Sequence, residues 1–137
     1  MNNVVINKVQ SLQRCVSRAR EEYQSAGEAF LTNFTRQDAA ILNITRACEQ
    51  AIDLANHVVR SQKLGIPDES RKSFELLAEP GFIGSELAEK LSRMVGFRNI
   101  AIHSYQDINP DILVALVTVE SEDLLRFSEL MLQRSGH

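Results

Sequence analysis

Residues 41–59 read ILNITRACEQAIDLANHVV. Apolar residues recur in this stretch at intervals of three and four, which is the periodicity of a helix with one buried face. The residues predicted to face inward are Ile41, Ile44, Cys48, Ala51, Ile52, Ala55, Val58 and Val59. We therefore expect a long helix, with Thr35 as its N-cap, Asp38 in a capping-box-like place three residues on, and residues 64–67 as its stop.

The same spacing continues on both sides of this helix. It predicts a first helix with a buried stripe from Val5 to Tyr23, a short helix from Ser70 to Ala78, a helix capped by Ser85, and a last helix that begins at Asn109-Pro110. Residues 114–120, VALVTVE, are β-branched, but they lie inside a longer three-four pattern and have no second strand to pair with. The sequence thus predicts an all-α, up-and-down bundle of four to five helices, in one domain over residues 1–137.

Composition limits the classes of function. The chain has 137 residues, of which 44% are apolar and 24% charged, and a formal net charge of −3. Any contact with nucleic acid must therefore be local, or be made by an assembly that gathers basic residues on one side. Cys15 and Cys48 show no metal-ligand spacing, and we expect reduced thiols in the core. With no secretion leader or membrane span in the sequence, we expect a cytoplasmic protein.

Residues 98–105, RNIAIHSY, gather reactive side chains at one helix end. Arg98 continues the apolar stripe of the preceding turns, and Tyr105, seven residues further, falls on the same line if the helix persists. Asn99 and His103 are four apart and share an adjacent face. The segment thus offers a fixed cation, an amide, an imidazole and a phenol within about two helical turns.

The position of Arg98 predicts a partner. It follows Leu87 and Leu91 along the buried side of the helix, where a guanidinium is costly unless an anion or a second protomer meets it. Gly96 has no side chain and lets another backbone approach. We therefore expect a two-fold homodimer through this helix, in which both copies of the motif line one groove.

A purely structural interpretation stays open on spacing alone. Arg98 can pair with a carboxylate, His103 can interact with the dipole at the helix C-terminus, and Tyr105 can be ordinary core. His57 is expected to be a surface or satisfied core histidine, and His137 a terminal one. We expect no metal site and no cofactor.

The motif belongs to a wider resemblance. Residues 98–105 resemble the R-N-x-x-x-H-x-Y signature of HEPN domains, in particular the HepT-type ribonuclease toxins that are paired with a minimal nucleotidyltransferase antitoxin. Residues 43–57, the L-G-I-P of 64–67, the S-F-x-x-L-A of 73–78 and the segment 90–99 are similar to that family in order and spacing. The resemblance covers nearly the whole chain.

This resemblance implies a HEPN-like fold and assigns roles. Arg98 and His103 are expected to catalyse metal-independent RNA cleavage by attack of the 2′-hydroxyl, and Asn99 to support them. Tyr105 is expected to be adenylylated by an MntA-type nucleotidyltransferase antitoxin, with which the homodimer forms a hetero-oligomer. Transfer RNA and messenger RNA are both open as substrates. The alternative is a non-catalytic subunit that presents a nucleotide or another substrate to a minimal nucleotidyltransferase.

Overall fold

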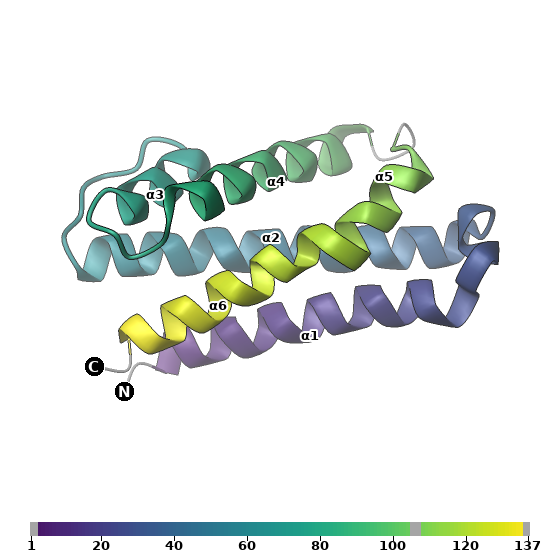
Figure 1. Cartoon of the computed structure of the whole chain (residues 1–137), viewed down its shortest axis with the longest axis horizontal. Helices are drawn as coiled ribbons and strands as arrows, with labels where there is room; N and C mark the ends of the chain where they lie inside the picture. The colour runs from purple at the N-terminus through teal and green to yellow at the C-terminus, as the bar shows by residue number, and fades with distance from the viewer. Residues whose placement is uncertain (1–2, 105–107, 136–137) are drawn as a thin grey trace.

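The computed structural model describes residues 3–104 and 108–135 and places them in a helical bundle (Figure 1). No strand occurs among these residues, so the all-α prediction is confirmed for them. The elements are α1 (Asn3–Ala26), the 3₁₀ turn η1 (Gly27–Leu31), α2 (Phe34–Ser61), α3 (Ser70–Ala78), α4 (Ser85–Ser104), α5 (Pro110–Ala115), the π-helical turn η3 (Leu116–Glu120) and α6 (Ser121–Ser135). Since α5, η3 and α6 follow one another without a break, they form the single last helix that the sequence predicts.

Helix α2 is the centre of the bundle, because it contacts each of the other elements. Figure 1 shows α1 and α2 running in opposite directions, α4 on the other side of α2, and the α5–α6 helix crossing them obliquely. The up-and-down arrangement is therefore confirmed. Among the described residues, no helix is both long enough and apolar enough to cross a membrane.

The buried stripes agree with the apolar spacing. Every residue predicted to face inward on α2 is buried, apart from the half-buried Ile41. On α1 the stripe from Val5 is buried as far as Ala19, and Tyr23 packs at its edge with its ring edge-on to Phe30, 5.4 Å between centroids. Both cysteines are free thiols in this core, as expected.

The start of α2 differs from the prediction. The cap is Asn33, whose side-chain oxygen accepts a hydrogen bond of 3.1 Å from the backbone N–H of Arg36. Asn33 has the extended backbone of an N-cap (φ −99°, ψ 95°), whereas Thr35 already lies in the first helical turn. The Thr35 cap, and the capping box with Asp38, were therefore wrong. Asparagine and threonine are both good caps, and the sequence pattern does not show which of two neighbouring candidates adopts the extended conformation.

The last helix begins as predicted and then widens. The side-chain oxygen of Asn109 accepts a hydrogen bond of 2.8 Å from the N–H of Asp111, and Pro110 is the first helical residue. At η3 the backbone forms a π-helical turn, and the Val117 carbonyl accepts hydrogen bonds from Ser121 Oγ at 2.6 Å and from Arg20 Nε at 3.3 Å. Side chains thus bind a carbonyl in the turn where the α-helical ladder is interrupted.

Candidate functional site at the end of α4

Helix α4 carries three of the four predicted site residues. Its first part is anchored by the buried side chains of Leu87, Leu91, Met94 and Val95, and its last part contains Arg98, Asn99 and His103. A firmly packed helix is a precise support for functional side chains. Tyr105 lies outside the described residues.

The Arg98 guanidinium is bound by a neutral partner. The Nη2 and Nε atoms of Arg98 lie 2.7 Å and 3.3 Å from Oδ1 of Asn99 and donate hydrogen bonds to it. Among the described residues, no carboxylate pairs with Arg98. The structural interpretation proposed a carboxylate partner for Arg98, and the partner found among the described residues is an amide instead. The half-buried guanidinium has donors left for a ligand.

The charge of Arg98 acts on a buried thiol of α2, which agrees with its place on the apolar stripe. Burial raises the pKa of the Cys48 thiol to about 12, and the nearby Arg98 guanidinium acts in the opposite direction. A thiol with this pKa stays protonated at neutral pH, so Cys48 does not neutralise the arginine. The positive charge of Arg98 is therefore balanced neither by Asn99 nor by Cys48.

The backbone of His103 belongs to the last turn of α4. Residues three, four and seven apart share a face of an α-helix, so His103 follows Asn99 on one face. Asn99, which is exposed, lies between the two predicted catalytic residues and accepts the hydrogen bonds of Arg98. One helix end therefore presents a cation held by an amide, with a histidine position one turn beyond.

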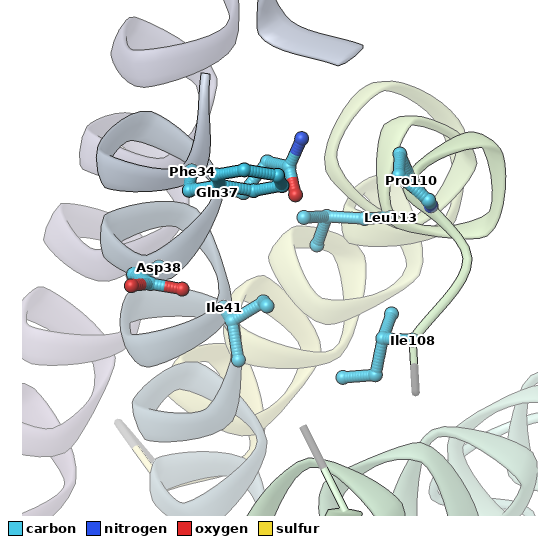
Figure 2. A pocket seen from close by; sticks show the side chains of 7 residues that line it. All are labelled: Phe34, Gln37, Asp38, Ile41, Ile108, Pro110 and Leu113. Atoms are coloured by element: carbon cyan, nitrogen blue, oxygen red, sulfur yellow. The ribbon is translucent and has the colours of Figure 1, made fainter. Parts of the chain in front are cut away.

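The structure also contains a hollow that the sequence did not reveal (Figure 2). It has a volume of about 440 Å³ and lies between α2 and the start of α5. It is lined by Phe34, Gln37, Asp38, Ile41, Ile108, Pro110 and Leu113. The Phe34 ring is 74% exposed, and Gln37 Nε2 donates a hydrogen bond of 2.8 Å to the Phe30 carbonyl. Its walls come from segments about 70 residues apart in sequence, so no local pattern predicts it.

The other predictions for this chain concern two further histidines and metal binding. His57 is half-buried on α2 and has an interaction partner, which agrees with the structural expectation for it. His137 lies outside the described residues. Within the described ranges, no group of three or more His, Cys, Asp or Glu side chains could hold a metal ion.

The chain is similar to several characterised proteins. It is 46% identical over 131 residues to a protein of Shewanella oneidensis named mRNA nuclease HepT, with 96% of this chain and 98% of that protein covered. A solved tri-AMPylated Shewanella oneidensis HEPN toxin in complex with MNT antitoxin matches with a TM-score of 0.89 and 45% identity, over 96% and 98% of the two chains. A toxin–antitoxin crystal structure with AMP-PNP matches with a TM-score of 0.88 and 44% identity, over 96% and 99%.

The family described as ribonuclease HepT-like matches residues 12–131, which include all of α2, α3 and α4 and the whole RNIAIHSY motif. The near-complete coverage of the relatives agrees with this match. The chain therefore belongs to the ribonuclease HepT-like family.

Proposed function

We propose that this chain is the toxin of a toxin–antitoxin pair and an endoribonuclease of the cytoplasm that cleaves RNA without a metal ion. The observation that carries the proposal is the guanidinium of Arg98, half-buried on the helix end that carries His103, whose hydrogen-bond partner among the described residues is an amide. The relatives named as a ribonuclease and as a HEPN toxin support it.

The proposed reaction uses the 2′-hydroxyl of the RNA as nucleophile. The 2′-oxygen attacks the adjacent phosphorus and loses its proton, the bond to the 5′-oxygen breaks, and that oxygen gains a proton. His103 transfers the protons, because an imidazole both takes and gives a proton near neutral pH. Arg98 donates hydrogen bonds to the phosphoryl oxygens as negative charge builds on them, and Asn99 orients Arg98. DNA lacks this nucleophile, so the reaction selects RNA.

A two-fold dimer completes the proposed site. The reaction needs a base and an acid, and a single chain offers one histidine in the motif. If α4 packs against its symmetry mate, two copies of Arg98 and of His103 line one groove. Exposed apolar side chains on α4 and on the neighbouring α5, Ile100 at 54% and Ile112 at 56%, support an interface on this part of the molecule.

The test of the nuclease uses purified protein in excess chelator. It should cut RNA and leave 2′,3′-cyclic phosphate and 5′-hydroxyl ends, and expression of the chain alone should arrest bacterial growth. Loss of cleavage in chelator would show that a metal takes part. Light scattering should give twice the chain mass of 15.4 kDa or a multiple of that value. A monomer would contradict the mechanism in which two protomers share one groove.

Control by the partner is proposed to act at Tyr105. An MntA-type nucleotidyltransferase would add adenylate to its hydroxyl, and each added nucleotide would bring a phosphodiester charge that competes with substrate for Arg98. Intact-mass spectrometry after co-expression should show adenylate-sized steps that disappear in Tyr105→Phe. That variant should remain an active nuclease in the presence of the partner; if the partner silences it equally, modification of Tyr105 is not the switch.

The second candidate is a non-catalytic subunit that presents a nucleotide or another substrate to a nucleotidyltransferase. The hollow beside Phe34 favours it, because its volume and the exposed ring suit a stacked base (Figure 2). For this function, Phe34→Ala should abolish AMP binding measured by calorimetry, and expression of the chain alone should leave growth unchanged. If expression of the chain alone arrests growth and expression of His103→Ala does not, the result supports the nuclease and not the binding subunit.

A further inference from the structure

The face of α4 that carries Asn99 and His103 can be followed back along the helix. Gly96 lies three residues before Asn99 and seven before His103, so the three positions share one face. Small residues continue this face toward the start of α4, namely Ser85, Ala88 and Ser92. Helix α3 packs along this part of α4, and a groove of about 520 Å³ lies between the two helices.

Arg71, in the first turn of α3, lies over the bare backbone at Gly96. Its Nη2 atom is 3.4 Å from the place where a Cβ on Gly96 would stand. No hydrogen bond or ion pair joins the exposed Arg71 side chain to another described residue. A guanidinium with no partner among the described residues therefore lies over the α4 face that carries Asn99 and His103.

The separation from the motif suits a second contact on the same RNA strand. With a rise of about 1.5 Å per residue, Gly96 precedes Asn99 by about 4.5 Å and His103 by about 10 Å along the helix axis. A phosphate bound at Arg71 would therefore lie beside the one being cleaved. A guanidinium suits this contact, because its planar fork donates two hydrogen bonds to a phosphate.

Charge in the α3–α4 groove favours one course for the strand. Away from Arg71, the groove is lined by three carboxylates, Glu75, Glu79 and Glu89. Two of them have partners in exposed, weak ion pairs: Glu75 with Lys72 at 3.5 Å, and Glu89 with Arg93 at 3.9 Å. A polyanion is repelled from the acidic end and attracted to the Arg71 end.

We propose that Arg71 binds the backbone phosphate next to the one that is cleaved, and so positions the RNA strand along the Asn99–His103 face. The inference rests on the proposed nuclease function. It identifies a positioning residue outside the motif, on a different helix. Arg71 acts on the strand beside the reacting phosphate and takes no part in proton transfer.

The test combines one protein change with one substrate change. The protein variant is Arg71→Gln, and its matched control is Lys72→Gln, which removes the same charge from the next residue of α3. The substrate is an RNA oligonucleotide that the wild-type protein cleaves, made also with a neutral methylphosphonate in place of each phosphate flanking the cleaved bond. The measured quantity is kcat/KM, with the melting temperature of each variant as the check on folding.

Arg71→Gln should lower kcat/KM about tenfold on the native RNA, as expected for loss of a charge-assisted contact. One methylphosphonate should cost the wild type a similar factor and cost Arg71→Gln almost nothing more, because the two changes remove the same contact. Lys72→Gln should cleave native RNA with the kcat/KM of the wild type. On the methylphosphonate RNA, its kcat/KM should fall by the same factor as that of the wild type.

Two results would overturn the inference and leave the proposed nuclease function intact. In the first, Arg71→Gln is as active as the wild type. In the second, the losses in kcat/KM from Arg71→Gln and from the methylphosphonate multiply at both flanking phosphates. A wild-type protein that cleaves no RNA would instead overturn the proposed function, and this inference with it.

Discussion

Arg20 on α1 and Arg98 on α4 are both half-buried arginines of the bundle, but their surroundings differ. The Arg20 guanidinium binds the Val117 carbonyl, Ser121 Oγ at 2.8 Å and a Glu122 carboxylate at 3.1 Å. The Arg98 guanidinium binds the amide of its neighbour Asn99 and has no carboxylate partner among the described residues. The fold uses the donors and the charge of Arg20, and it leaves those of Arg98 largely unused.

This difference indicates a structural role for Arg20 and supports the functional role proposed for Arg98. Removing Arg20 takes hydrogen bonds from the interrupted ladder at η3, so the loss is one of stability. Removing Arg98 takes one neutral partner from Asn99, which is exposed and can bind water instead. We therefore expect substitutions at the two arginines to affect different measurements, and we give the predictions in order of expected size.

The largest effect is expected at His103. Replacing it by alanine should lower the rate of RNA cleavage by about 10²–10⁴-fold, the usual contribution of general acid–base catalysis. The helical circular dichroism spectrum and the melting temperature should stay the same. A fall of less than about threefold would take histidine out of the mechanism.

Arg98 is expected to come next. Arg98→Ala should cost about 10²–10³-fold in kcat, as for the loss of a donor to a developing oxyanion. Arg98→Lys should recover only part of this, because an ammonium keeps the charge but not the fork. If lysine restored full activity, the role of Arg98 would be charge alone.

Arg20→Met should act on stability. It removes the hydrogen bonds to Val117 and Ser121, and should lower the free energy of unfolding by about 1–3 kcal/mol. Urea denaturation measures this directly. Activity well below the melting temperature should stay within about threefold of the wild type; a large loss of activity in the folded variant would contradict the structural role.

The smallest effect is expected at Gly96. A Cβ there meets Arg71 Nη2 at an ordinary contact distance of 3.4 Å, so Gly96→Ala should stabilise the helix by about 0.5–1 kcal/mol. Gly27, with φ +58°, is the matched contrast, because Gly27→Ala should destabilise the turn. Thermal denaturation of the two variants should give shifts of opposite sign.

Periodicity alone predicted most of this fold. The three-four spacing gave the helices and their buried sides, and Asn109-Pro110 marked a helix start that the structure confirms. It predicted Thr35 as the cap of α2, whereas the structure has Asn33, since the cap depends on where the extended backbone lies. Nor did it reveal the π-helical turn at η3, because residues 114–120 keep a helical spacing whether the turn is α or π.

The candidate site was predictable only along its own helix. The spacing of Leu91 and Arg98 indicated the face that Arg98 shares, and the closeness of Arg98 to Cys48 agrees with it. Arg71 could not be found in this way, because it reaches Gly96 from another helix. The expectation that Gly96 admits the backbone of a second protomer stays a prediction; within one chain, Arg71 Nη2 lies 3.4 Å from the place where a Cβ on Gly96 would stand.

The most direct test of the account is cleavage, in excess chelator, of a DNA strand that contains one ribonucleotide. The wild-type protein and Arg20→Met should cut this strand only on the 3′ side of the ribonucleotide and leave a 2′,3′-cyclic phosphate, while His103→Ala should cut it at least a hundredfold more slowly. Cleavage at deoxyribonucleotides, or equal rates for the wild type and His103→Ala, would contradict catalysis by this helix end.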